Sequence, residues 1–242
     1  MPRYRDVQFS FFPPLTRMVK ALLVVTSAAF LLTYLPAQFA GFDLPFRLFG
    51  LTPYLVTHRL FIWQSFTYLF LHGGWLHIIF NLFALAMFGP DIESRWGGRR
   101  FLFYFFLTGV GAGLFSVILQ PSSQVMTIGN SGAIYGVLLA YGMLFPDRPI
   151  FLWFVIPIKA KWFVLIMGAI ELYLSLATPG SGVSHVAHLG GMIFGFAYLR
   201  GRWLGGNWRG QYQQWRQARL RRKFEVYMRK HEGKDDRGQW IN

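Results

Sequence analysis

Cysteine is absent from this chain of 242 residues, and charged residues are scarce. Without a thiol, the chain can form no disulfide, use no cysteine nucleophile and bind no metal through cysteine sulfur. Charged residues make up 14% of the sequence, whereas soluble domains carry about 25%. Hydrophobic residues reach 54% and aromatic residues 19%. This balance excludes an ordinary soluble domain and indicates a membrane protein.

Several apolar stretches are long enough to be membrane helices. Crossing the hydrocarbon core takes about 20 apolar residues, and fewer where a helix is buried among others. The stretches are 18–38, 75–90, 101–120, 131–146, 161–178 and 185–201. The sequence therefore predicts an all-α membrane protein, a bundle of six transmembrane helices over residues 18–201. A cytoplasmic segment, 1–17, precedes this bundle, and a basic cytoplasmic tail, 202–242, follows it.

The positive charge that gives the chain its net +14 is unevenly distributed. If the N-terminus is cytoplasmic, only Arg47 and Arg59 of the 24 lysines and arginines fall in outer segments. Cytoplasmic segments carry the excess of Lys and Arg, so both termini are predicted to be cytoplasmic. A basic tail beside a membrane is expected to contact anionic lipid headgroups. The tail has no recognisable nucleic-acid-binding module, so nucleic acid is not an expected partner.

The outer connections differ in character. Residues 39–74 are rich in Phe, Leu, Trp and Tyr, which predicts an element lying in the outer membrane interface rather than a solvated loop. Residues 121–130 and 179–184 carry no charge and are rich in Ser, Gly and Pro. They are typical of mobile caps.

Polar side chains inside membrane helices are functional candidates, because placing them in hydrocarbon is unfavourable. His77 and Asn81 lie near the start of the second stretch, Ser131 opens the fourth, and His185 and His188 open the sixth. All three stretches begin on the outer side in this topology. We therefore expect these side chains to share one shallow depth and to face one another if the three helices pack together.

Glycine spacing predicts that the fourth and sixth helices touch. Small residues at i and i+4 let helix backbones approach closely in a bilayer. His188 shares a helix face with the glycines of the sixth stretch, so its ring is expected to point toward Ser131. A hydrogen bond between nucleophile and base needs about 2.6–3.2 Å between heavy atoms. The glycine pairs are Gly132 with Gly136, and Gly191 with Gly195.

Three motifs resemble those of the rhomboid family of intramembrane proteases. The first is carried by HGGWLHIIFN, the second by GNSGAIYG and the third by AHLGGMIFG. The matching residues are His72, His77 and Asn81; Gly129, Ser131, Gly132 and Tyr135; and Ala187, His188, Gly191 and Gly195. The resemblance covers roughly residues 60–200. One position departs from the family pattern: Trp63 is followed by Gln64 where the family usually has arginine, which puts any role of that arginine in anchoring the outer loop in doubt.

The resemblance implies a six-helix rhomboid-like bundle that acts as a serine endopeptidase on transmembrane protein substrates near the outer interface. It implies Ser131 as nucleophile and His188 as general base, without an acidic third member. We expect no Asp or Glu within reach of the start of the sixth stretch. Glu171 is interpreted as a structural hydrogen-bonding residue outside the chemistry. By the same analogy the ring of Tyr135 packs against His188 and orients it.

The resemblance also implies how the developing oxyanion is held. The expected donors are the backbone N–H of Ser131, the Asn81 amide and His77, with help from the positive end of the fourth helix. No metal and no cofactor is expected. The 179–184 cap and the adjoining end of the fifth stretch are the predicted gate. Supporting roles fall to Tyr135, His72, Gly129, Gly132, Gly191 and Gly195. A bacterial cytoplasmic membrane is the predicted location, and the oligomeric state is left open.

Other functions stay open on the sequence alone. Four histidines, among them His72 and His185, could bind zinc, but the chain has no HExxH motif and no carboxylate is expected near them. A non-proteolytic rhomboid-like membrane chaperone is a second alternative, although such relatives typically lack the serine or the histidine. A transporter or channel is a third, and Glu171 is the only acid central to a predicted helix. Labelling by a serine-directed fluorophosphonate separates the protease from the others.

Overall fold

A computed structural model describes residues 13–152, 155–178 and 184–201 of the chain. All helices before residue 185, and residues 185–197 of the last described helix, belong to the compact unit that ends at Ala197. Residues 1–12, the basic tail and all but the last residue of the predicted 179–184 cap lie outside the described residues. The predictions made for those segments therefore stay predictions.

All six predicted stretches are helical. The helices are α1 (Arg17–Ala40), α5 (Trp75–Trp96), α6 (Gly98–Leu119), α7 (Ser131–Leu144), α8 (Ala160–Ala177) and an unlabelled helix over residues 185–201. Among the described helices, α1, α5, α6 and α8 are long and apolar enough to cross a membrane by themselves, and α7 is a shorter apolar helix. The all-α membrane bundle is thus confirmed, while six complete crossings stay a prediction.

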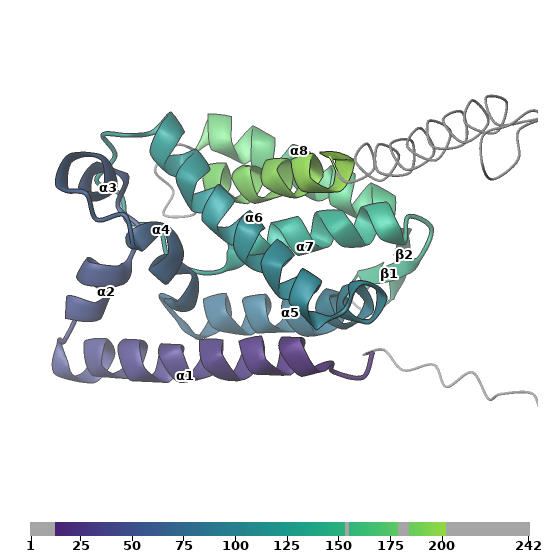
Figure 1. Cartoon of the computed structure of the whole chain (residues 1–242), viewed down its shortest axis with the longest axis horizontal. Coiled ribbons are helices and arrows are strands. Elements are labelled where there is room, and N and C mark those ends of the chain that lie inside the picture. The colour runs from purple at the N-terminus through teal and green to yellow at the C-terminus, as the bar shows by residue number, and fades with distance from the viewer. Residues whose placement is uncertain (1–12, 153–154, 179–183, 202–242) are drawn as a thin grey trace, which may run out of the picture. The chain divides into compact units, whose positions relative to one another are not determined.

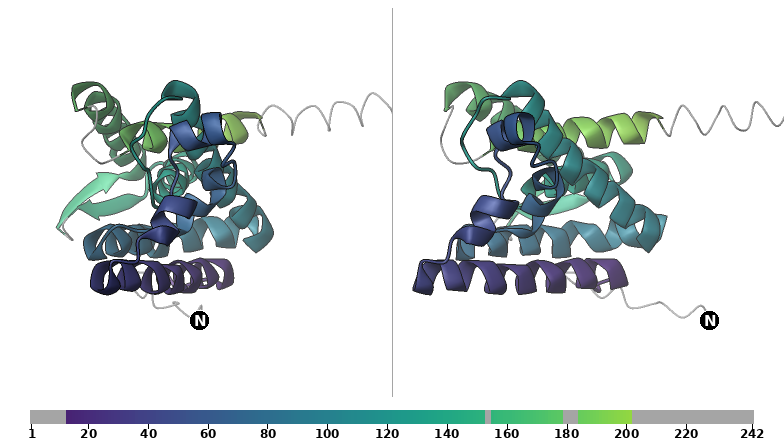
Figure 2. Two further views of the ribbon diagram at one scale, coloured as in Figure 1. Left: turned by 90° about the vertical axis from the view of Figure 1, so that its left-hand side faces the viewer. Right: turned by 60° about the vertical axis from the view of Figure 1, so that its left-hand side comes forward.

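Helix α7 lies at the centre of the bundle and packs against α5, α6 and α8, whereas α1 lies along α5 (Figures 1 and 2). The glycine contact predicted between the fourth and sixth helices is only partly as expected. A Cβ at Gly191 would overlap the carbonyl oxygen of Gly132, so the 185–201 helix does touch α7 there. Gly136 instead faces Thr108 of α6, and its carbonyl accepts a hydrogen bond from Tyr104 (2.7 Å). The prediction that Gly136 contributes to the contact with the sixth helix is therefore wrong.

The end of α5 is joined to the start of α1 through a buried carboxylate. Glu93 accepts hydrogen bonds from the backbone N–H groups of Met18 (3.0 Å) and Val19 (2.9 Å) and from the hydroxyl of Thr16. The first N–H groups of a helix have no acceptor within the helix. Glu93 therefore satisfies donors of α1 that would otherwise be unpaired, and it fixes α1 beside α5.

The apolar connection after α1 is folded into short helices: α2 (Leu44–Phe49), α3 (Pro53–Arg59), α4 (Gln64–Thr67) and the 3₁₀ turn η1 (Tyr68–Phe70). Gln64 is fully buried among them. Its oxygen accepts from the Thr52 N–H (3.1 Å), and its nitrogen donates to the Arg47 and Leu48 carbonyls, each at 3.3 Å. The neutral amide at this position therefore ties three points of the connection together without the arginine that the family usually has there.

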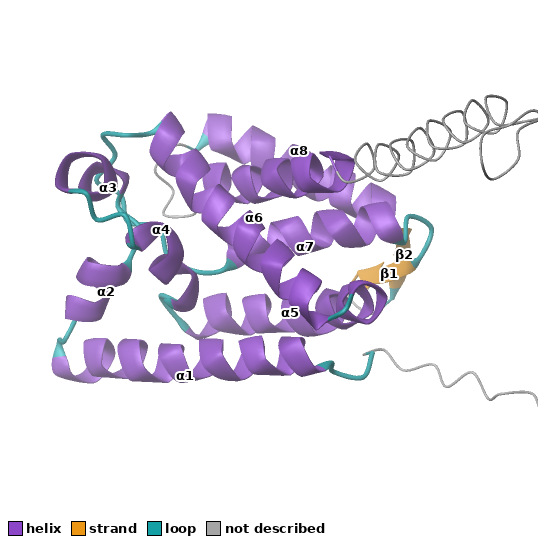
Figure 3. Ribbon diagram, in the orientation of Figure 1, coloured by secondary structure: helices purple, strands orange, loops and turns teal. Residues whose placement is uncertain are grey.

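A two-stranded hairpin follows α7 and departs from a purely helical bundle (Figure 3). Strand β1 (Pro149–Leu152) pairs antiparallel with β2 (Ile156–Lys159). The sequence did not predict it. The run is almost continuously apolar and contains two prolines, so it lacks the polar–apolar alternation from which a half-buried strand is recognised.

Candidate active site

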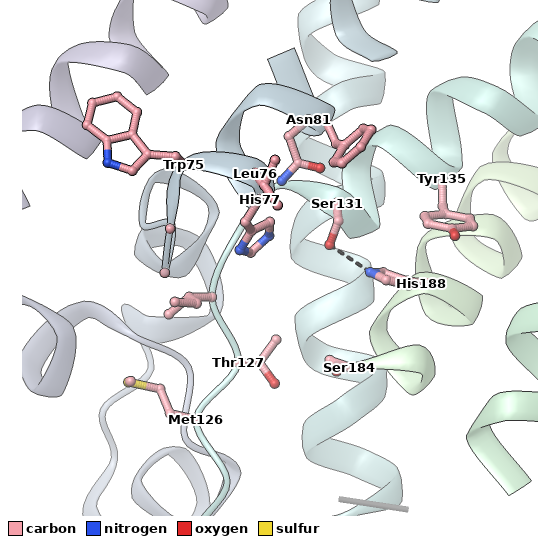
Figure 4. A pocket seen from close by; sticks show the side chains of 14 residues that line it. Trp75, Leu76, His77, Asn81, Met126, Thr127, Ser131, Tyr135, Ser184 and His188 are labelled. Atoms are coloured by element: carbon pink, nitrogen blue, oxygen red, sulfur yellow. Dashed lines mark hydrogen bonds between the residues drawn. The ribbon is translucent and has the colours of Figure 1, made fainter. Parts of the chain in front are cut away.

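The start of α7 brings Ser131 next to His188. Ser131 is the first residue of α7, and His188 lies one turn into the helix that begins at residue 185. The Oγ of Ser131 is 2.8 Å from the Nε2 of His188 (Figure 4). The contact is possible because the two helix backbones approach closely where Gly191 meets Gly132. This distance lies in the range required of a nucleophile and its general base.

The backbone before Ser131 depends on a glycine. Gly129 has φ +106°, a conformation that residues with a Cβ rarely adopt. A Cβ there would also lie 2.6 Å from the Nε2 of His77. The glycine therefore allows the chain to turn sharply into α7 while passing close to His77.

Tyr135 lies one helical turn after Ser131 and packs against His188. Its ring stacks on that of His188, with centroids 4.4 Å apart and planes inclined by 13°. The stacking restricts how the imidazole can rotate, and Figure 4 shows Tyr135 on the far side of His188 from Ser131. The structure thus places Tyr135 where the resemblance expects it.

The serine opens into a cavity of about 760 Å³. His77 and Asn81 of α5 line it together with Ser131 and His188, and Figure 4 shows them on the opposite side of the serine from the histidine. Asn81 is buried, and its Nδ2 has no hydrogen-bond partner among the described residues. An amide with uncommitted N–H groups beside a nucleophile can donate to an oxyanion.

His72 lies just before α5 and does not line the cavity. It is fully buried, and its ring meets that of His77 edge-on with centroids 4.9 Å apart. Burial, together with the neighbouring His77, lowers the pKa of His72 from 6.5 to about 4. His72 is therefore neutral at physiological pH and supports His77 by packing.

The expectation that no acid reaches the start of the sixth helix is wrong. Glu171 of α8 is buried, and its Oε2 lies 2.7 Å from the Nδ1 of His185 and 3.0 Å from the Nδ1 of His188. Its Oε1 accepts a hydrogen bond from the hydroxyl of Tyr135. Glu171 does form hydrogen bonds to neighbouring helices, as the sequence predicted for a structural residue. Its partners, however, include the candidate base and the residue stacked on that base.

The same carboxylate changes the assessment of a metal site. The expected absence of a nearby carboxylate is wrong, since donor atoms of Glu171, His185 and His188 lie within 4.8 Å of one another. The histidines of the zinc alternative do not act as one set, because His72 packs against His77 whereas His185 and His188 meet at Glu171. The Nε2 of His188 is also directed at Ser131. A metal would have to compete with these contacts.

Comparison with known sequences places the chain in a family. The family model described as the Rhomboid domain matches residues 60–203. Rhomboid-like protease 5 of Toxoplasma gondii is 35% identical over 147 residues, which are 57% of this chain and 17% of that protein. Rhomboid-like protein 11, chloroplastic, of Arabidopsis thaliana is 30% identical over 172 residues, or 62% of this chain and 56% of that protein.

A mitochondrial relative extends the match. Rhomboid protein 1, mitochondrial, of Saccharomyces cerevisiae is 25% identical over 205 residues, covering 78% of this chain and 56% of that protein. The matched part of the chain thus covers at most 56% of the length of any of these three relatives. The matched region contains α5 to α8 and every residue of the site described above. The chain belongs to the rhomboid family and is a multi-pass integral membrane protein of the kind that includes intramembrane proteases.

Proposed function

We propose that this protein is an intramembrane serine endopeptidase in which Ser131 is the nucleophile and His188 the general base. The observation that carries the proposal is the 2.8 Å contact between Ser131 Oγ and His188 Nε2 at the edge of a cavity. An isolated serine is a weak nucleophile and becomes reactive when an adjacent base accepts its proton. Both groups are held by helices, one of them at the centre of the bundle.

The reaction follows from these contacts. Ser131 Oγ attacks the carbonyl carbon of a peptide bond, and its proton moves to His188 Nε2. His188 then returns that proton to the leaving amine as the C–N bond breaks, which leaves an acyl ester on Ser131. Water hydrolyses the ester in a second step with His188 again acting as base.

The oxyanion formed during attack would be held from the α5 side. Asn81 Nδ2 has no other partner among the described residues, and His77 lines the same cavity. The N–H of Ser131 lies in the first turn of α7, where backbone donors lack acceptors within the helix. The positive end of the α7 dipole adds to the stabilisation of the negative charge.

The proposed substrates are transmembrane protein segments that unwind near the outer membrane interface, since a peptide bond within a helix is not accessible to a nucleophile. The orientation that makes this interface the outer one rests on the distribution of Lys and Arg, which also places both termini in the cytoplasm. The relatives named above include chloroplast and mitochondrial proteins and give the bacterial placement no support. That placement stays a prediction from the sequence.

The test uses the purified chain, a single-span model substrate and a fluorophosphonate probe. We expect the probe to label wild-type protein at Ser131, and Ser131→Ala and His188→Ala each to abolish cleavage while the protein stays folded. The double variant should be no worse than either single variant, because the two groups act as a unit. EDTA should leave activity unchanged.

Two outcomes contradict the proposal. Loss of cleavage in EDTA with recovery on adding zinc would indicate a metal-dependent enzyme built on Glu171, His185 and His188. A folded wild-type protein that binds membrane proteins but neither cleaves them nor reacts with the probe would indicate the non-proteolytic chaperone.

A further inference from the structure

One buried acid connects three elements of the site. Glu171 comes from α8, Tyr135 from α7, and His185 and His188 from the helix that begins at residue 185. The carboxylate is in contact with all three side chains, through Oε1 to the tyrosine hydroxyl and through Oε2 to the two imidazoles. A charged group in the interior of a membrane bundle is unfavourable unless it is paired. Here one partner is the proposed base, His188, and the rings of the other two, Tyr135 and His185, lie against it.

The contact with His188 is made by the nitrogen that faces away from the serine. Nε2 of His188 lies on Ser131, and Nδ1 lies 3.0 Å from Glu171 Oε2. The two atoms are in contact, but the imidazole is not aligned for a hydrogen bond, and Nδ1 has no hydrogen-bond partner among the described residues. Catalytic hydrogen bonds in structures without substrate are often poorly aligned and tighten in the complex.

A carboxylate on Nδ1 has a defined consequence. It favours the tautomer with hydrogen on Nδ1, which leaves the Nε2 lone pair free to accept the serine proton. It also stabilises the imidazolium that forms when that proton arrives. Tyr135 adds to this effect, because its hydroxyl holds the same carboxylate while its ring stacks on the imidazole.

We propose that Glu171 is a positioning residue for His188, which makes the site a Ser131–His188–Glu171 arrangement rather than a dyad. The proposal rests on the proposed protease function and deepens it. Glu171 keeps its charge throughout the cycle. The Ser131 proton resides on His188 Nε2 and leaves with the amine, while the hydrogen on Nδ1 stays between the imidazole and the carboxylate.

The alternative is that Glu171 only holds α8 to its neighbours. The chain provides a matched control for that role, since Glu93 is also a buried carboxylate with several donors. Its donors are Thr16, Met18 and Val19 at the start of α1, and none of them lines the cavity. Replacing Glu93 by glutamine should therefore disturb packing without reaching the chemistry.

The experiment compares wild type, Glu171→Gln and Glu93→Gln in detergent, each as the whole chain of 242 residues. For each, thermal unfolding gives the folded fraction, and the rate of Ser131 acylation by a fluorophosphonate, kcat and KM are measured per folded molecule. We expect Glu171→Gln to lose roughly 10²- to 10⁴-fold in acylation rate and kcat with little change in KM, because an amide in place of the acid misorients the base. Glu93→Gln should lower the melting temperature and keep wild-type rates per folded molecule.

A second variant and a spectroscopic readout cover the case in which Glu171→Gln does not fold. Glu171→Asp keeps the charge for the bundle but withdraws the carboxylate by one methylene, so its acylation rate should also fall at unchanged KM. In wild-type protein labelled at Ser131, the Nδ1 hydrogen of His188 should give a low-field proton resonance.

The failures of the two proposals are distinct. Normal acylation per folded molecule in Glu171→Gln or Glu171→Asp, or a missing Nδ1 resonance, would overturn the positioning role and leave the Ser131–His188 protease in place. A wild-type protein that is not acylated at Ser131, or that needs zinc, would overturn the protease itself.

Discussion

Two buried glutamates of this protein are chemically identical and differ in their surroundings. Glu93 is bonded to two backbone N–H groups and a threonine hydroxyl, none of which changes its protonation in the physiological range. Glu171 is hydrogen-bonded to the His185 imidazole and the Tyr135 hydroxyl, and it contacts the His188 imidazole at 3.0 Å. The first arrangement satisfies the start of a helix, and the second can respond to a proton arriving at His188. Burial alone therefore does not distinguish a structural acid from one at a reaction centre, whereas the nature of its partners does.

The comparison extends to the two ends of α5. The end that carries Glu93 has its polar groups committed to fixed backbone donors, while Asn81, near the other end, faces a cavity with its amide nitrogen uncommitted. If this difference reflects function, substitutions at the cavity should change rates, and substitutions of satisfied groups elsewhere should change stability.

The largest effect outside the Ser–His–Glu group is expected at Asn81. Asn81→Ala should lower kcat by about 10²–10³ with little change in KM, because a donor to the oxyanion acts chiefly in the transition state. Asn81→Asp should be worse, since a carboxylate repels the oxyanion. The measurement is kcat and KM per folded molecule together with the melting temperature.

Gln64 is the control for this prediction, because it is also a buried amide but bonds three backbone groups. Gln64→Ala should cost about 1–3 kcal/mol of stability through the unsatisfied groups it leaves, and it should turn over normally per folded molecule. An Asn81→Ala protein that behaves in this way would remove Asn81 from the site.

The positions of the helices could be predicted from the sequence because apolar length is a strong signal, and all six stretches are helical. The grouping of Ser131, His188, His77 and Asn81 could be predicted from depth, since each lies near the predicted outer start of a helix. The contact of Glu171 with His188 was missed because the depth argument was applied only to helices predicted to begin outside. Glu171 lies six residues before the end of α8, about 9 Å along the helix, and counting back from that end brings it near the level of His188.

Other features had no such signal. The hairpin of β1 and β2 is hidden in an apolar run without alternation. The side of α7 that Gly136 faces depends on where α6 crosses, and helix spacing alone does not determine that. Small residues predict that a helix is approached closely, but the partner helix is fixed only by the packing of the whole bundle.

Gly191, beside the proposed active site, and Gly89, near the Glu93 end of α5, provide the next comparison. A Cβ at Gly191 would overlap a backbone carbonyl of Gly132, whereas a Cβ at Gly89 would meet a methyl of Val19 at 2.7 Å. Gly191→Ala should therefore move the 185–201 helix away from α7 and lower the rate per folded molecule by about 10²-fold, because an ångström of displacement breaks the Ser–His contact. Gly89→Ala should cost about 1–3 kcal/mol of stability through overpacking and leave that rate unchanged.

Acylation by the fluorophosphonate and thermal unfolding are measured on both alanine variants. Equal rates per folded molecule in Gly191→Ala and Gly89→Ala would show that packing beside the proposed active site affects the rate no more than packing at the Glu93 end of α5. The close approach at Gly132 would then be unnecessary for the chemistry.

The smallest effect concerns His72, a buried ionisable group that has neither the fixed donors of Glu93 nor the carboxylate that His185 and His188 contact. Its pKa is lowered by burial from 6.5 to about 4, so between these values the unfolded chain binds a proton that the folded protein excludes. Stability from this group is complete above pH 6.5, declines as the pH falls, and is reduced by at most about 3 kcal/mol below pH 4.

His72→Gln removes the titration but keeps polar atoms at the site. Because other titrating groups cancel in the difference, the melting temperature of wild type minus that of His72→Gln should fall steadily from pH 7 to pH 4. A difference that stays constant over that range would mean that His72 is protonated equally in the folded and unfolded states, and that burial does not control its charge.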